Sequence, residues 1–296
     1  MDHFEMVEKL REKANVSYEE AKAALKEFYQ QVGEKYPEEE EVYRTLRGML
    51  RREFILSRLA GLKGTFLDVG CNRGSYLESW QGGPRFGLDI SLGALRQSPA
   101  LLTGRLVQGD AERLDCFRPG SFDHLLCSEV LEHCLHPGMI FTGIALVLKP
   151  GGQALLTTPN YHGRRPEHLP LGILEEYGVE CSCGGSYFHT AYRPGELEAM
   201  ARAAGLEVAE SGTLEKEVKY AAKLPAALLL FVRWINRFLR WPRLGRANEA
   251  FFHTFTLACH RFCAATRLER LLLPLVREGV RSYIVMRKPC TQMEPR

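Results

Sequence analysis

Residues that could bind a nucleoside follow two apolar runs of the chain. The run TFLDVG (65–70) ends at Gly70, and Asn72 and Gly74 follow it before a helix-compatible segment. A glycine directly after a parallel strand lets a ligand lie against bare backbone, and the next helix offers unpaired N–H groups. Asp89 ends the run RFGLDI (85–90), nineteen positions after Gly70. A carboxylate there can accept both hydroxyls of a ribose, so the spacing predicts a nucleoside site.

A second group of residues has the types that bind metal ions or transfer protons. Glu129 lies near the end of the run FDHLLCSEV (122–130), Glu132 and His133 follow this run, and His189 lies in YFHTAYRP (187–194). On a helix, residues at i, i+3 and i+4 share one face, so the first three predict half of a divalent-metal site that His189 could complete. The alternative is that the glutamates only complement a helix dipole. We favour this second interpretation and assign no metal ligand.

The elements that must hold these residues form an alternating pattern. Short apolar runs, separated by helix-compatible segments, are typical of a parallel sheet whose crossover helices cover both faces. A helix over 194–204 leads to a further run at 206–211, and a last β-like run occupies 282–288. We therefore predict an α/β fold with a doubly wound, mostly parallel sheet of seven strands. The five runs before that helix are TFLDVG (65–70), RFGLDI (85–90), RLVQGD (105–110), FDHLLCSEV (122–130) and QALLTTPN (153–160).

Two parts of the chain do not belong to a minimal sheet. The N-terminal part has apolar residues at helical spacing, and so do some sixty residues before the last strand. We expect an N-terminal helical segment (1–62), a core (63–213), a helical insertion or cap (214–280) and a last strand with a tail (281–296).

Composition excludes several classes of protein. The 296 residues are 45% hydrophobic and 25% charged, with 39 basic against 36 acidic side chains, which excludes a disordered chain and a chain held on nucleic acid by charge alone. The nine cysteines are odd in number and scattered, as expected for reduced thiols. We find no signal-peptide core and no apolar stretch of about 18 to 20 residues. We expect a cytoplasmic protein without a DNA partner.

Five motifs in order resemble the class I S-adenosylmethionine-dependent methyltransferases, in the group that includes ubiquinone-biosynthesis O-methyltransferases. The resemblance covers roughly residues 43 to 211 and the final strand. Asn72 replaces the middle glycine of the first motif, and asparagine is the residue besides glycine that best tolerates a positive φ. The matching positions are Asp68-x-Gly70-x-Asn72-x-Gly74, Asp89, Gly109-Asp110-Ala111, Ser128-Glu129 and Leu148-Lys149-Pro150-Gly151-Gly152.

This resemblance implies that the donor is S-adenosylmethionine and the product S-adenosylhomocysteine. A nicotinamide enzyme shares the glycine turn and the ribose acid, but the turn lacks the G-x-G-x-x-G spacing, so we do not favour it. Arg44, on the helix before the core, is our candidate for the methionine carboxylate. The implied donor-binding residues are Arg44, Asp68, Gly70, Cys71, Asn72, Gly74, Asp89, Ile90, Asp110, Ala111 and Ser128.

Methyl transfer from a sulfonium is an in-line displacement that needs positioning and, for a protonated acceptor, a base. We expect His133, on the first turn of a helix after strand four, and His189, in a loop that closes over the acceptor, to serve catalysis. The acceptor we favour is a small, apolar molecule methylated at oxygen. A metal-dependent RNA 2′-O-methyltransferase, whose Glu-x-x-Glu-His pattern is similar, is the alternative.

One further segment has a distinctive charge pattern. Residues 214–246 contain eight basic residues against Glu215 and Glu217, interleaved with Leu, Phe and Trp. A basic amphipathic helix of this kind is typical of an element lying in a membrane interface, here the inner membrane surface. A helical cap packed on the sheet is the alternative. A donor-binding, non-catalytic module at a membrane surface also stays open.

Overall fold

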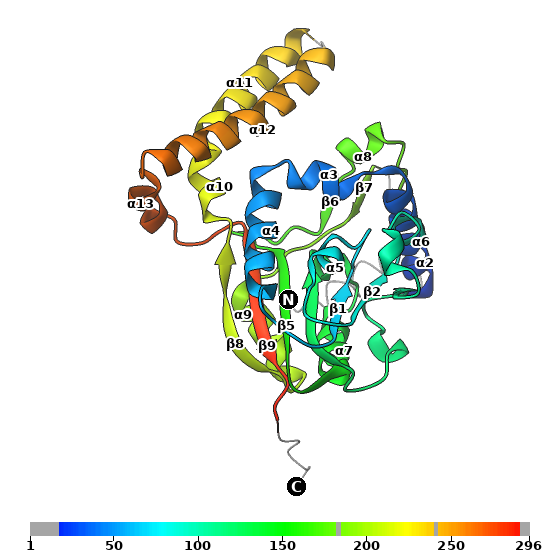
Figure 1. Cartoon of the computed structure of the whole chain (residues 1–296). Helices are drawn as coiled ribbons and strands as arrows, with labels where there is room; N and C mark the ends of the chain where they lie inside the picture. The colour runs from blue at the N-terminus through cyan, green and yellow to red at the C-terminus, as the bar shows by residue number, and fades with distance from the viewer. Residues whose placement is uncertain (1–17, 182–184, 240–241, 291–296) are drawn as a thin grey trace. The chain divides into compact units, whose positions relative to one another are not determined.

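The computed structural model describes residues 18–181, 185–239 and 242–290 (Figure 1). The chain divides into two compact units. Unit 1 contains residues 1–38, 59–212 and 282–296, and unit 2 contains residues 39–58 and 213–281. Each unit is described by itself below.

A seven-stranded sheet forms the centre of unit 1, in the order β3-β2-β1-β4-β5-β9-β8. Strand β1 pairs in parallel with β2 and with β4, strand β2 pairs in parallel with β3, and strand β4 pairs in parallel with β5. These pairs confirm the predicted doubly wound sheet. The strands are β1 (Phe66–Val69), β2 (Arg85–Asp89), β3 (Leu106–Gln108), β4 (Phe122–Ser128), β5 (Leu148–Pro159), β8 (Glu207–Leu214) and β9 (Arg281–Arg287).

Strand β5 begins earlier than the sequence indicated. The segment Lys149-Pro150-Gly151-Gly152, which precedes the apolar run QALLTTPN (153–160), lies within the strand. Leu148 pairs with Phe122, and a register shift separates this pair from the later ones. A β-bulge or irregularity of this kind lets glycine-rich backbone stay within a strand.

The largest hydrophobic core lies between one face of the sheet and the helices that cover it. Ile140, Phe141 and Ile144 of α7 (Pro137–Val147) are fully buried there, together with Leu197 and Ala201 of α9 (Pro194–Ala203). The remaining short helices between strands are α5 (Ser75–Ser79) and α6 (Leu92–Leu95), with the 3₁₀ turns η1 (Ala100–Leu102), η2 (Leu114–Cys116) and η3 (Leu131–His133).

Two further parts of unit 1 lie beside the sheet. Helix α2 (Tyr18–Lys35) packs against α6 (Figure 1). A two-stranded antiparallel sheet of β6 (His168–Pro170) and β7 (Ser186–Phe188), with α8 (Ile173–Glu176), interrupts the chain after β5 and was not predicted. Phe28 and Val32 of α2 form a separate small core with residues of this part, namely Leu171, Leu174 and Val179.

Unit 2 is helical. It contains most of α3 (Glu38–Tyr43) and α4 (Leu46–Leu59), then α10 (Lys216–Ala221), α11 (Lys223–Leu239), α12 (Pro242–Ala265), α13 (Glu269–Leu272) and η4 (Leu273–Leu275). Helices α11 and α12 lie side by side as a hairpin (Figure 1). Among the described residues, no helix combines the length and apolar character needed to cross a bilayer.

Candidate active site

The glycine turn after β1 has the backbone that the sequence predicted. Gly70 and Gly74 have φ values of 75° and 92°, and Asn72 has φ 50°. A side chain at Gly70 would also clash, since a Cβ there would lie 2.1 Å from Cγ2 of Val130. The turn is closed against β2, because the N–H of Gly70 donates to the carbonyl of Leu88 at 2.7 Å.

Asp89 ties this turn to the end of β2. Its Oδ2 accepts the backbone N–H of Asn72 at 2.8 Å, and its Oδ1 accepts that of Ser91 at 2.9 Å. Burial raises the pKa of Asp89, and the backbone N–H groups only partly offset this. A carboxylate has about four acceptor positions, so two backbone bonds leave room for ribose hydroxyls.

The other residues predicted on the first two strands lie around this turn. Asp68 is buried within β1 at 2% exposure, and Cys71 is buried directly after the strand. Ile90 follows Asp89. The Asn72 amide donates to Oε2 of Glu38 at 2.9 Å. The turn therefore brings the predicted residues of two strand ends to one edge of the sheet.

Asp110 lies in an ion-pair network that includes a residue the sequence analysis missed. Nζ of Lys22, on α2, lies 2.8 Å from Oδ2 of Asp110 and 2.8 Å from Oε1 of Glu112. Glu112 is almost fully buried, and its Oε2 accepts the hydroxyl of Tyr18 at 3.0 Å. Burial lowers the pKa of Lys22, but the two carboxylates raise it by more, so this pKa lies above its ordinary value. Ala111, between the two acids, is buried.

Ser128 and Glu129 end β4 beside the turn. The hydroxyl of Ser128 lies 2.9 Å from that of Thr157, which also donates to Oε1 of Glu129 at 3.2 Å. Glu129 has φ 58°, a left-handed conformation that a helix cannot contain.

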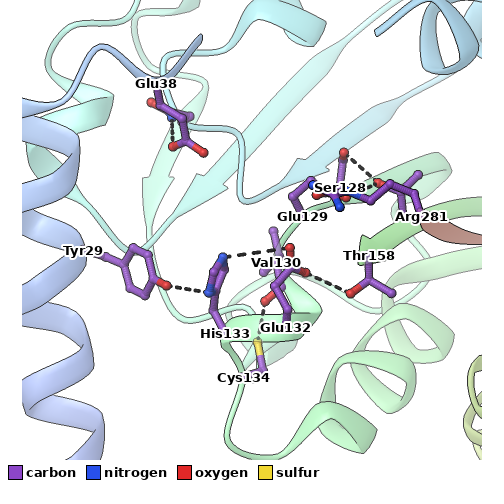
Figure 2. Close-up of polar contacts among 12 residues, drawn as sticks. Tyr29, Glu38, Ser128, Glu129, Val130, Glu132, His133, Cys134, Thr158 and Arg281 are labelled. Carbon is purple, nitrogen blue, oxygen red and sulfur yellow. Dashed lines mark hydrogen bonds and ion pairs between the residues drawn. The ribbon is translucent and has the colours of Figure 1, made fainter. Parts of the chain in front are cut away.

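This conformation corrects the predicted helical face of Glu129, Glu132 and His133. Only Leu131–His133 is helical, as a single 3₁₀ turn, and Glu129 lies outside it. Glu132 is buried and accepts the Thr158 hydroxyl at 3.0 Å (Figure 2). A 3₁₀ turn places residues three apart in line, so the i, i+3, i+4 pattern of an α-helix does not apply.

His133 faces α2. Nδ1 of its ring lies 2.5 Å from the Tyr29 hydroxyl (Figure 2). Burial and the neighbouring His189 lower the pKa of His133 to about 3, although the Glu129 charge opposes them. The imidazole is therefore neutral at any pH near 7.

His189 lies beside His133, as expected for the second catalytic candidate. It follows β7, and the two imidazole centroids are 5.1 Å apart. Tyr187 adds a third ring, 6.4 Å from that of His133, and it stacks on Phe28 of α2 at 5.1 Å. Three elements thus form an aromatic group next to the end of β4.

One acid and two histidines of this group have metal-ligand spacing. Ligand atoms of Glu132, His133 and His189 all lie within 4.8 Å of one another. Nε2 of His133 and Oε1 of Glu132 are 4.0 Å apart, roughly twice a nitrogen or oxygen bond to a divalent ion. Carboxylate and imidazole donors of this kind fit one divalent ion, whereas Glu129 is not among them.

Arg44 belongs to unit 2. Its guanidinium donates to Oε1 of Glu41 at 3.4 Å and is largely exposed. Its part in binding a methionine carboxylate stays a prediction.

Comparison with known proteins agrees with this geometry. A family described as "Methyltransferase domain" matches residues 67–156. The chain is 36% identical over 176 residues to a ubiquinone biosynthesis O-methyltransferase of Ralstonia nicotianae, covering 56% of this chain and 72% of that protein. A protein of the same name from Xanthomonas euvesicatoria is 34% identical over 190 residues, covering 59% and 76%.

Solved structures share the fold. A putative methyltransferase in complex with the Haloferax volcanii Trm112 activator has a TM-score of 0.53 at 20% identity, covering 90% of this chain and 98% of that one. The Burkholderia thailandensis 1,6-didemethyltoxoflavin-N1-methyltransferase also has a TM-score of 0.53, at 15% identity, covering 93% and 91%.

Proposed function

The chain belongs to the class I S-adenosylmethionine-dependent methyltransferases, and from this premise we propose that its acceptor is a small, apolar aromatic molecule with a hydroxyl group. The protein is an enzyme that transfers the methyl group of S-adenosylmethionine. The comparisons favour neither RNA methylation nor a non-catalytic role. The acceptor, the residues that act on it and its source are the proposed parts.

The observation that supports an aromatic acceptor best is the group of rings at the end of β4. Tyr29, His133, Tyr187 and His189 come from three elements and lie within 6.4 Å of a neighbouring ring centroid. Aromatic side chains bind another ring by offset or edge-to-face contacts. The names of the relatives point to the same chemistry, and for this chain we infer a phenolic precursor of a quinone or a similar lipid-like metabolite.

The donor is held, in this proposal, by the edge that contains the glycine turn. Asp89 binds the ribose hydroxyls, and Asp110 with Ala111 faces the adenine. Gly70 and Gly74 allow the backbone to approach the donor closely, and Ser128 lies beside it at the end of β4. S-adenosylmethionine supplies an electrophilic methyl group on a sulfonium, so no residue has to activate the leaving thioether.

His133 is the proposed base. With its pKa lowered to about 3, the ring is a weak base near pH 7, so in this proposal the neighbouring Glu129 and Glu132 carboxylates must raise that pKa as the ring accepts the proton that the acceptor hydroxyl loses. Glu132 lies 4.0 Å from Nε2 and would stabilise the imidazolium that forms. His189, whose ring centroid lies 5.1 Å from that of His133, would position the acceptor beside the imidazole.

A divalent ion held by Glu132, His133 and His189 is the second candidate, supported by their spacing. Such an ion would lower the pKa of a hydroxyl bound to it. The two mechanisms differ in what they require. A base mechanism predicts that chelation with EDTA leaves turnover intact and that Glu132→Gln costs less than His133→Ala. An ion mechanism predicts loss on chelation and similar losses in both variants.

We also place the enzyme in the cell interior at a membrane surface, which it contacts through residues 214–246. An apolar acceptor concentrates in lipid, so an enzyme at the bilayer would meet it there. The segment's basic residues and exposed apolar side chains support this placement.

The function is tested with catechols that have alkyl tails of increasing length. Purified protein is incubated with methyl-labelled S-adenosylmethionine, and O-methylated product is separated and counted. We expect turnover, with kcat/KM rising as the tail lengthens. Tight binding of S-adenosylhomocysteine without methylation of any catechol would overturn the proposed acceptor class, and no binding would overturn the donor site.

A further inference from the structure

Exposed apolar side chains and positive charge are both concentrated in unit 2. This unit has 18 basic and 9 acidic residues, a net charge of +9, whereas the whole chain has +3. Of 17 exposed large hydrophobic side chains among the described residues, 12 belong to unit 2, although it is the smaller unit. A water-facing cap would hide apolar side chains rather than gather them, so this distribution indicates an interaction surface.

Helix α11 provides most of that surface. Its residues 225, 229, 232 and 236 are at least partly buried, whereas one broad arc of the helix is exposed. Phe231 and Trp234 stack at 6.3 Å, and Trp234 meets Phe238 edge to face at 5.7 Å. Phe238 is the most exposed of the group, at 76%. The exposed apolar residues of α11 are Leu224, Leu228, Leu230, Phe231, Trp234 and Phe238.

We infer that this face of α11, defined by those six residues, docks unit 2 onto an anionic lipid bilayer. The aromatic side chains enter the interface between headgroups and acyl chains, where tryptophan and phenylalanine are favoured. The net positive charge of the unit attracts it to the anionic headgroups. In this proposal the helix lies in the plane of the membrane, because its exposed apolar side chains share one arc and all enter the bilayer together only in that orientation.

Charge decides between lipid and the other apolar partner, a second copy of this chain. Two copies that met through this face would bring together two units of +9 each, which repel each other. An anionic surface reverses the sign of that interaction. One part of the inference rests on the proposed function, namely that docking gives the enzyme access to an apolar acceptor in the same bilayer.

Sedimentation with vesicles tests the inference. The full chain is mixed with vesicles of phosphatidylcholine alone or of phosphatidylcholine with phosphatidylglycerol. We expect partition onto the anionic vesicles to be at least about tenfold stronger, and to weaken as salt screens the charge. The double variant Trp234→Ser/Phe238→Ser is expected to lose about tenfold or more of that partition.

The matched control removes two exposed apolar side chains of unit 1. Leu101→Ser/Ile173→Ser changes residues that are 50% and 48% exposed, and we expect it to bind vesicles as the wild type does. Equal binding of wild type to both vesicles, or none to either, overturns the inference. So does a concentration-dependent dimer, measured by analytical ultracentrifugation without lipid, that the α11 variant abolishes.

Separate measurements keep this result distinct from the proposed function. Binding of S-adenosylhomocysteine and methylation of the water-soluble 4-methylcatechol are measured for wild type and the α11 variant. Both are expected to be equal in the two proteins. If 4-methylcatechol and its longer homologues are not methylated while vesicle binding follows the expected pattern, the acceptor is wrong and the docking face stands. If the catechols are methylated but the protein does not bind vesicles, the proposed acceptor stands and the docking face is wrong.

Discussion

The hydroxyl of Tyr29 lies 2.5 Å from Nδ1 of His133, although the two residues are 104 positions apart in the chain. An imidazole on a single 3₁₀ turn has little local support, so the N-terminal helix supplies its orientation. The contact also determines which ring nitrogen is engaged, because Nδ1 is the one that meets the phenol.

Tyr29→Phe tests this contact. It removes one hydrogen bond and leaves the ring, so we expect kcat to fall about tenfold while affinity for S-adenosylhomocysteine stays unchanged. Nitrogen-15 spectra of the histidine rings are expected to show a changed Nδ1 signal for His133. The control is Tyr220→Phe in unit 2, which deletes a buried hydroxyl that has no hydrogen-bond partner among the described residues. Unaltered kcat and spectra would show that the hydroxyl does not hold the ring.

Asp89→Ala tests the donor site. The variant loses a carboxylate that accepts the backbone N–H groups of Asn72 and Ser91 and that we propose to bind the ribose hydroxyls. We expect the Kd for S-adenosylhomocysteine in calorimetry to rise about a thousandfold, some 4 kcal/mol. Asp115→Ala changes an exposed carboxylate on η2 and is expected to bind normally. Equal Kd values in wild type and Asp89→Ala would remove Asp89 from the donor site.

Substitutions at Asn72 test whether the site requires the positive φ of this residue or its side-chain amide. Its φ of 50° suits glycine, so Asn72→Gly should bind donor within about threefold of wild type, losing only the amide contact to Glu38. A β-branched residue is strained there, and we expect Asn72→Val to lower the free energy of unfolding in urea by about 1 to 3 kcal/mol. A valine variant as stable as the glycine variant would contradict the backbone assignment.

Lys22→Met tests the ion pairs that join α2 to Asp110 and Glu112. Without the ammonium, the buried Glu112 carboxylate loses its cation, and we expect a loss of about 3 kcal/mol in unfolding free energy. Lys26→Met, on the same helix but exposed, provides the comparison and should change stability by less than about 0.5 kcal/mol. Similar losses in both variants would mean that the loss comes from helix α2 in general.

His133 also predicts how stability depends on pH. Its folded pKa of about 3 lies below the unfolded value of about 6.5, so between these values the unfolded chain binds the extra proton. Protonation of this histidine in the unfolded chain therefore leaves the free energy of unfolding unchanged above pH 6.5 and lowers it progressively as the pH drops toward 3. Urea unfolding with EDTA present, at pH 4.5 and 7.5, should show a smaller acid loss in His133→Asn than in wild type, by roughly 2 kcal/mol. Equal losses would mean that another group causes the acid sensitivity.

The arrangement of the proposed donor-binding residues could be predicted because these residues are local to strand ends. Gly70, Asn72 and Asp89 are separated by fixed distances along one β-α-β unit, and parallel pairing of β1 with β2 brings these ends together. The tolerance of asparagine for positive φ was likewise a property of one residue, and the structure confirms it.

The acceptor side could not be predicted in the same way. Lys22 and Tyr29 belong to an amphipathic helix without any motif, and only tertiary packing brings them to Asp110 and His133. The spacing of Glu129, Glu132 and His133 suggested an α-helix, but the positive φ of Glu129 is a backbone choice that spacing does not encode.

Helix α2 contacts both proposed substrate sites through two residues that lie two helical turns apart. Lys22 contacts the acid expected at the adenine, and Tyr29 contacts the proposed base. A single displacement of this helix would therefore break the Lys22 contact to Asp110 and the Tyr29 contact to His133 in one event.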